Sequence, residues 1–143
     1  MRIAVINGPN LNLLGTREPA LYGTETLADI EKHLLSVARE LGVELTFSQH
    51  NGEGEIVDAV QALRGRVDGA LVNAGAYSHT SLAIHDALAG VKVPFVEVHL
   101  TNIYAREDFR RRSVVSDVCR GSICGLGTAG YHLALEAMPW IIS

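Results

Sequence analysis

A carboxylate and an imidazole two positions apart, Glu97 and His99, are the residues that most clearly suggest chemistry, and they end an expected strand. Side chains two positions apart on a strand point to the same side, so these groups can meet at the strand's carboxyl end. A carboxylate beside imidazole selects its tautomer and stabilises its protonated form, which suits a general acid. A purely structural pair at a strand end is the other interpretation of the same residues.

A second candidate lies in the long segment 7–23, which carries several amides, Arg17 and Tyr22 between an apolar strand and an expected helix. Loops this long in compact α/β domains are typically binding loops or lids. A guanidinium near a phenol favours the phenolate, so Arg17 would make Tyr22 a general base. Packing of Tyr22 in the loop is the alternative, and three other tyrosines compete for the role: Tyr77, Tyr104 and Tyr131.

The segment from Asn73 to His79 follows the third expected strand and consists mostly of small residues. Small residues bring backbone close to a ligand at a helix N-terminus, where Asn73 and His79 could bind hydroxyls or a carboxylate. An ordinary turn, in which Asn73 and Ser78 satisfy backbone groups, explains the same residues. Asp86 lies seven positions after His79, roughly on the same helical face, but it has no partner in sequence, so a solvated surface acid is the stronger interpretation.

The sequence lacks the motifs typical of metal, nucleotide-cofactor and Schiff-base chemistry. The histidines show no metal-binding spacing, so we expect no metal. Neither a dinucleotide-binding nor a P-loop glycine pattern follows a strand, so we expect no cofactor. Lys32 and Lys92 lie away from the expected crevice, which disfavours Schiff-base chemistry. A tyrosine base, a histidine acid, amides and arginines remain, a set suited to proton abstraction beside a carbonyl with loss of a leaving group, as in a dehydratase.

These residues must be positioned by alternating strands and helices. Apolar runs predict strands over 3–7, 43–48, 69–73, 94–98 and 119–125, and amphipathic stretches predict helices over 26–41, 54–64, 80–89, 127–137 and, briefly, 105–111. The alternation predicts an α/β fold with a flavodoxin-like, doubly wound, five-stranded parallel sheet of order 2-1-3-4-5. Ligands bind such sheets beyond the carboxyl ends of the strands, where segments 7–23, 73–79 and 97–102 should converge.

Length, composition and charge limit the number of domains and the kinds of binding partner. The chain has 143 residues, 48% of them hydrophobic and 20% charged, which predicts a single domain over 1–143. A net charge of -4 argues against nucleic-acid binding, although an arginine cluster could meet a small anion or form a solvated helix face: Arg106, Arg110, Arg111 and Arg112. No apolar run approaches a membrane span and no leader is visible, so we expect a cytoplasmic protein with reduced Cys119 and Cys124.

Five motifs together resemble one enzyme family. They are Asn7-Gly-Pro-Asn-Leu-Asn-Leu-Leu-Gly15, Arg17-Glu-Pro19, Asn73-Ala-Gly-Ala-Tyr-Ser-His-Thr-Ser81, Glu97-Val-His-Leu-Thr-Asn102 and Arg106-Glu-Asp-Phe-Arg110. In order and spacing the chain resembles type II 3-dehydroquinate dehydratase over nearly its whole length. The resemblance implies reversible anti dehydration of 3-dehydroquinate to 3-dehydroshikimate through an enolate, without the imine used by type I enzymes.

The resemblance also implies roles for the candidate residues. Tyr22 matches the base that removes the C2 proton, Arg17 the arginine that holds this tyrosine ionised, and Asn10 the amide that positions a water at the enolate oxygen. His99 matches the acid that protonates the departing C1 hydroxyl, and Glu97 the carboxylate that orients it. The loop from about 11 to 22 would close over the substrate.

Substrate binding and assembly are implied in the same way. Asp86 matches a residue that reaches the site of a neighbouring subunit, which implies a homo-oligomer, a trimer and usually a dodecamer of four trimers. Five further positions match groups that hold the substrate's hydroxyls and carboxylate: Asn73, His79, Arg110 and the backbone at Leu100 and Thr101.

A non-catalytic flavodoxin-like module that binds a nucleotide or a phosphoryl group is the competing hypothesis, because topology alone permits it. Such a module needs a hydroxyl- and glycine-rich phosphate loop after the first strand, whereas Asn10 is followed directly by Leu11. Either hypothesis predicts a small-molecule ligand. The dehydratase hypothesis leaves open whether the enzyme serves shikimate synthesis or quinate breakdown.

Overall fold

The structure, a computed structural model, describes residues 1–16 and 18–143, with Tyr22 described by its backbone only. Its centre is one parallel sheet of order β2-β1-β3-β4-β5. The order 2-1-3-4-5 predicted from the sequence is confirmed. The strands are β1 (Arg2–Asn7), β2 (Glu44–Gln49), β3 (Gly69–Asn73), β4 (Phe95–His99) and β5 (Gly121–Cys124).

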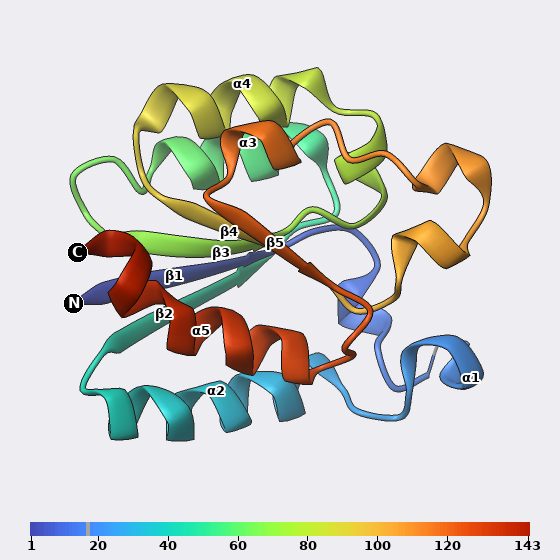
Figure 1. The fold of residues 1–143 in the computed structure, drawn as a ribbon, viewed down its shortest axis with the longest axis horizontal. Coiled ribbons are helices and arrows are strands. Elements are labelled where there is room, and N and C mark those ends of the chain that lie inside the picture. Colours follow the sequence, from blue (N-terminus) through green and yellow to red (C-terminus); the bar gives the residue numbers. More distant parts are fainter. Residues whose placement is uncertain (17) are drawn as a thin grey trace.

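Helices cover both faces of this sheet. Figure 1 shows α3 and α4 together on one face and α2 and α5 together on the other. The buried apolar residues form two separate cores, one under each pair of helices. The helices are α1 (Pro19–Tyr22), α2 (Leu27–Leu41), α3 (Glu53–Gln61), α4 (Leu82–Val91) and α5 (Ala129–Ile142). Among the described residues, no helix is both long and apolar enough to span a membrane.

The helix α2 illustrates how local sequence determines an element. Thr26 and Asp29 form a capping box, in which each side chain accepts the backbone N–H of the other. The buried stripe along the helix faces the sheet, and Gly42 ends the helix in the left-handed conformation, with φ of 70°. Cap, stripe and terminator all agree with the helix predicted over 26–41.

Two predicted elements differ in the structure. The short helix expected over 105–111 is a pair of 3₁₀ turns, Ile103–Ala105 and Asp108–Arg110, because Glu107 between them is extended. The last helix was expected to end at 137 with Pro139 at its edge, but α5 continues through Pro139 to Ile142. Met138 is fully buried, and this packing outweighs the backbone hydrogen bond that Pro139 cannot make.

The last strand is also shorter than expected, because Cys119 follows a 3₁₀ turn over Ser116–Val118 and lies outside β5. Cys119 and Cys124 are both free thiols.

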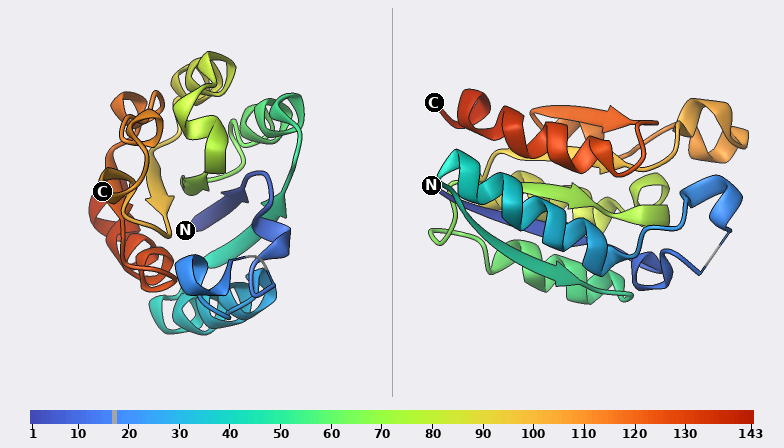
Figure 2. Two further views of the ribbon diagram at one scale, coloured as in Figure 1. Left: turned by 90° about the vertical axis from the view of Figure 1, so that its right-hand side faces the viewer. Right: turned by 90° about the horizontal axis from the view of Figure 1, so that it is seen from below.

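The segment after β1 divides into an anchored and a projecting part. Leu11, which begins a 3₁₀ turn over Leu11–Leu13, and Leu14, which follows this turn, are both buried in the core on the α2 face of the sheet. The short α1 follows and projects beyond the carboxyl end of the sheet, as Figure 2 shows. The fold therefore gathers α1 and the turns after β4 at one end of the molecule.

Candidate active site

The carboxyl ends of three neighbouring strands bring the candidate residues together. Asn7 at the end of β1 is paired in register with Asn73 at the end of β3, and Val72 is paired with Glu97 of β4. A cavity of about 200 Å³ lies at this edge, where ligands bind such sheets. Its lining includes Pro9, Asn10, Leu11, Asn73, Gly75, Ala76, His79, His99, Leu100, Thr101, Ile103, Arg106 and Arg110.

The contact expected between Glu97 and His99 is present. The Glu97 side chain is completely buried, and its Oε1 accepts a hydrogen bond from Nε2 of His99. Burial raises the pKa of Glu97, but the hydrogen bond and charge of His99, together with two serine hydroxyls, outweigh burial and hold that pKa below its usual value. Because the carboxylate occupies Nε2, Nδ1 is the nitrogen of His99 left for proton transfer.

Two serines that the sequence analysis missed complete the contacts of Glu97. Ser113 Oγ donates to Oε1 at 2.6 Å, and Ser116 Oγ donates to Oε2. They lie 16 and 19 residues from Glu97 along the chain, outside every motif considered. Only a three-dimensional contact identifies them, because serines in an irregular segment give no distinguishing signal in one sequence.

The Asn73 side chain is held by a buried relay. Its Nδ2 donates to the hydroxyl of Tyr131 at 2.9 Å, and its Oδ1 accepts the Gly75 N–H at 3.1 Å. The Tyr131 hydroxyl in turn donates to Oδ1 of Asn7 at 2.6 Å. Since these contacts orient the Asn73 amide, its second Nδ2 hydrogen is available to a ligand oxygen in the cavity.

The three tyrosines that competed with Tyr22 for the role of base do not line the cavity. Tyr131 is completely buried, and burial raises its pKa well above the usual value, so it stays neutral. Tyr77 donates its hydroxyl hydrogen to the Asn51 carbonyl at 2.8 Å, and Tyr104 is 64% exposed. None of these three phenols is therefore in a position to take a proton from a ligand there.

His79 lies beside His99 in the wall of the cavity. The two rings stack with centroids 6.1 Å apart and planes 23° from parallel. The His79 Nδ1 lies 2.8 Å from the Arg112 carbonyl oxygen, which can only accept, so Nδ1 carries the hydrogen. In neutral His79, Nε2 is then an acceptor that can bind a ligand hydroxyl.

The turns after β4 form the side of the cavity that carries Arg106 and Arg110. The Nε of Arg110 lies 3.1 Å from Oε2 of Glu107, close enough for an ion pair. Arg106 contributes a weak contact of 3.5 Å from Nη1 to Oγ1 of Thr101. Thr101, Arg106 and Arg110 line the same cavity, and guanidinium groups suit a carboxylate ligand.

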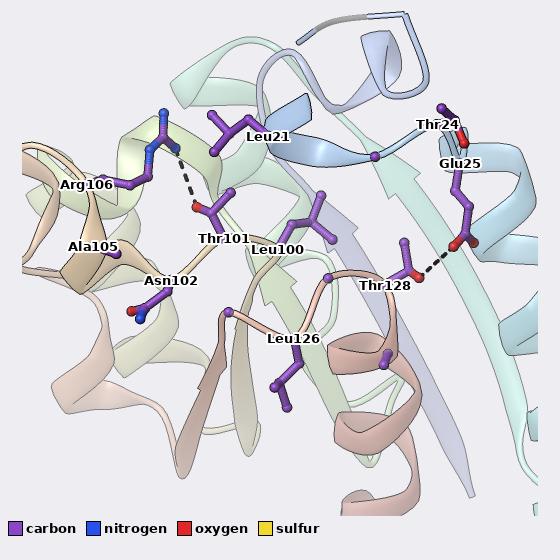
Figure 3. A pocket seen from close by; sticks show the side chains of 14 residues that line it. Leu21, Thr24, Glu25, Leu100, Thr101, Asn102, Ala105, Arg106, Leu126 and Thr128 are labelled. Carbon is purple, nitrogen blue, oxygen red and sulfur yellow. Dashed lines mark hydrogen bonds between the residues drawn. The ribbon is translucent and has the colours of Figure 1, made fainter. Parts of the chain in front are cut away.

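A larger hollow of about 660 Å³ adjoins the cavity and shares Leu100, Thr101 and Arg106 with it. Figure 3 shows its wall, in which Thr128 donates to Glu25 at 2.9 Å. This hollow contains neither His79 nor His99. The smaller cavity, where the imidazoles and amides converge, is therefore the candidate active site.

Asn10 lies at the opening turn of the loop and has a left-handed backbone with φ of 68°, which asparagine tolerates better than most residues. The end of β2 supports this turn: Asn51 Oδ1 accepts the Asn10 N–H at 3.1 Å, and Gln49 Nε2 donates to the Gly8 carbonyl at 3.1 Å. The Asn10 side chain is thus presented at the cavity from a supported backbone.

Of the remaining candidate residues, Asp86 does not line the cavity. Asp86 lies on α4 with its side chain 81% exposed, 2.9 Å from Nδ1 of His85. Arg17 and the side chain of Tyr22 lie outside the described residues. Within the part of the chain that the structure describes, no cluster of histidine, cysteine and acidic side chains could hold a metal ion.

The Tyr131 relay leads to a prediction about stability. Tyr131→Phe should destabilise the protein by about 1–3 kcal/mol, because the buried Asn7 Oδ1 and one Asn73 hydrogen lose their partner. Urea unfolding measures the change, and Tyr104→Phe is the matched control at an exposed tyrosine. Equal midpoints for the two variants would show that the relay contributes nothing to stability.

Known proteins are similar to this chain in sequence and in fold. The family model described as Dehydroquinase class II matches residues 1–139. A 3-dehydroquinate dehydratase of Prochlorococcus marinus is 56% identical over 138 residues, 96% of this chain and 95% of that protein. The Catabolic 3-dehydroquinase 1 of Aspergillus terreus is 57% identical over 134 residues, 94% of this chain and 88% of that protein. The crystal structure of a type II dehydroquinase from Butyrivibrio crossotus superposes with a TM-score of 0.95 at 42% identity, covering 97% of each chain.

Proposed function

The chain belongs to the dehydroquinase class II family and dehydrates 3-dehydroquinate, and we propose that it does so by a reversible anti elimination through an enolate intermediate. In this proposal residues 1–143 form one catalytic domain that works in the cytoplasm without a cofactor. The observation that carries it is the buried Glu97–His99 pair, which opens onto a cavity lined by amides, a second imidazole and guanidinium groups.

Proton removal is the first chemical step of this proposal. Tyr22, as tyrosinate, takes the proton from C2, and the guanidinium of Arg17 stabilises the phenolate. The electron pair of the broken C–H bond moves into the enolate. Asn10 positions a water that hydrogen-bonds the enolate oxygen, a role supported by its place in the cavity lining.

Loss of the hydroxyl group is the second step. His99 donates a proton from Nδ1 to the C1 hydroxyl, which leaves as water while the enolate collapses to the conjugated enone. Glu97 keeps the His99 ring oriented and stabilises the imidazolium that must be present beforehand. The buried hydrogen bond from Nε2 to the Glu97 carboxylate supports this assignment.

Binding groups surround the two proton-transfer sites in the proposal. Asn73 donates to a substrate hydroxyl and His79 accepts from one, which agrees with the hydrogens that the relay and the Arg112 carbonyl leave them. Arg110 binds the carboxylate, together with backbone groups at Leu100 and Thr101.

Assembly completes the proposal. Asp86 contributes to the site of a neighbouring subunit in a homo-oligomer, a dodecamer of four trimers. Its high exposure on α4 in the single chain is compatible with a contact made outside that chain.

A closing loop is the remaining part of the proposed mechanism. Burial of Leu11 and Leu14 in the core holds the first half of the loop in place. We therefore propose that closure over the substrate is confined to the part after Gly15, whose left-handed backbone, with φ of 90°, suits a pivot. This part contains both Arg17 and Tyr22.

Turnover with and without borohydride tests the proposed function. Purified protein should convert 3-dehydroquinate to the conjugated enone, seen as a rise in ultraviolet absorbance, and borohydride added with substrate should not inactivate it, because no imine forms. A colourless protein would additionally disfavour the flavin-binding alternative. Absence of turnover in folded, oligomeric protein would contradict the proposal, and inactivation by borohydride would contradict its enolate mechanism.

A further inference from the structure

Both oxygens of the buried Glu97 carboxylate are bound by hydroxyl groups from behind the active site. Ser113 serves Oε1 at 2.6 Å and Ser116 serves Oε2. The Ser113 oxygen also accepts the Val115 N–H at 3.3 Å, which directs the hydroxyl hydrogen towards Glu97. Donors on both oxygens suit an ionised carboxylate, because this form only accepts hydrogen bonds.

We propose that Ser113 and Ser116 are positioning residues, which keep Glu97 ionised and fixed so that it can orient His99 for the acid step. This inference rests on the proposed function and adds two residues that support its general acid, His99. The serines do not line the active-site cavity; they line a separate surface hollow of about 580 Å³. They therefore act on the reaction through Glu97 and not by touching substrate.

The backbone that carries the serines is well anchored. Val115 between them is completely buried in the core beneath α3 and α4, and the Val114 N–H donates to the Ser78 carbonyl at 2.7 Å. Arg112, directly before Ser113, provides the carbonyl that orients His79. One rigid segment thus supports both imidazoles of the cavity, His79 through its backbone and His99 through the two serines and Glu97.

Two other titratable groups, Cys119 and Asp117, lie around Glu97 and the serines. Cys119 lies near Glu97, and burial, with the charges of Glu97 and Asp117, raises the pKa of its thiol to about 12, so it stays neutral. Asp117 is largely exposed and lies 3.3 Å from Nε2 of His85.

On the cavity side, His79 and the guanidinium groups of Arg106 and Arg110 share the lining with His99. On the far side, Arg112 and His85 line the hollow next to the serines. Among the described residues, the hydrogen-bond donors on the carboxylate itself are His99, Ser113 and Ser116.

The pH dependence of catalysis tests the proposal. In the double variant Ser113→Ala/Ser116→Ala, the acid limb of kcat/KM should move to higher pH by about one to two units, because Glu97 loses two charge-assisted hydrogen bonds and is protonated more readily. The loss at neutral pH should fall mainly on kcat, since the serines do not line the cavity. A Ser113→Thr/Ser116→Thr variant keeps both hydroxyls and should restore the parental limb.

Ser122→Ala is the matched control, since this exposed serine is paired with Glu97 in the strand register without belonging to the site. It should leave the profile unchanged. A double alanine variant with lower thermal stability but an unmoved acid limb would reduce the serines to a structural role and overturn the proposal. A threonine variant whose limb moves as far as that of the alanine variant would also overturn it, because the hydroxyls would then not be responsible.

An infrared titration of the substrate-free protein separates this inference from the proposed function. The carbonyl stretch of protonated Glu97, assigned by its absence in Glu97→Gln, should appear at higher pH in the double alanine variant than in the parent. That result in a protein without turnover would support the serine contacts while contradicting the proposed function. Equal titration of Glu97 in parent and variant would overturn the inference even in an active enzyme.

Discussion

Tyr22→Phe should lower kcat by about 10²–10⁴-fold, the range typical of losing a general base, while the protein stays folded. The substitution removes only the phenolic oxygen that is proposed to accept the C2 proton. Substrate binding should change little, because the groups assigned to binding come from other segments. Steady-state kinetics with 3-dehydroquinate, together with circular dichroism and oligomeric state, measure the effect.

Tyr104→Phe is the matched control, since Tyr104 is exposed and absent from the cavity lining. Arg17→Ala should cause a comparable loss of kcat. Arg17→Lys should be more active than Arg17→Ala because it keeps the positive charge, but less active than the parent because it lacks the planar set of guanidinium donors. Near-parental rates for Tyr22→Phe would refute the base assignment. Near-parental rates for Arg17→Ala would show that the phenolate does not depend on this guanidinium.

His99→Ala should separate the two steps of the elimination. Loss of the C1 hydroxyl should slow by about 10²–10⁴-fold, because its acid is gone, while the base remains able to remove the C2 proton. In deuterated solvent the recovered substrate should therefore gain deuterium at C2 faster than product forms. Mass spectrometry of the substrate and absorbance of the enone give the two rates on one sample.

His132→Ala is a suitable control, because His132 lies on α5 and forms hydrogen bonds with His33 and Glu136 away from the cavity. Glu97→Gln should shift the balance in the same direction, since a neutral amide cannot stabilise the imidazolium. If exchange and dehydration fall by the same factor in His99→Ala, His99 does not act in a separate acid step.

Local geometry explains why part of the site could be predicted from the sequence. Glu97 and His99 share a side of one strand, so the period of two residues brings them together wherever that strand lies. Asn73 could be placed beside this pair because the carboxyl ends of parallel strands meet at one edge. These inferences need only the type of element and the order of the strands.

Packing between distant segments accounts for what the sequence analysis missed. Tyr131 and Asn7, 124 residues apart, meet only because α5 packs against β3 and β4, next to β1 in the sheet. From the sequence, Tyr131 is a candidate base. In the fold its phenol is buried and accepts a hydrogen bond that orients the Asn73 side chain. The helix α5 passes Pro139 for a similar reason, since the burial of Met138 depends on the sheet beneath it.

The sequence by itself determined the alternation of strands and helices, the order of the sheet and the edge at which chemistry-bearing side chains gather, because these follow from periodicity and chain direction. The tertiary structure decided which hydrogen-bond partners those side chains have within the protein, and therefore which donors and acceptors remain for a ligand. Ser113 and Ser116 reach Glu97, and Tyr131 reaches Asn73, through contacts between segments far apart in the chain. Hydrogen bonds of this kind depend on positions within a few tenths of an ångström, which arise only when all layers pack together.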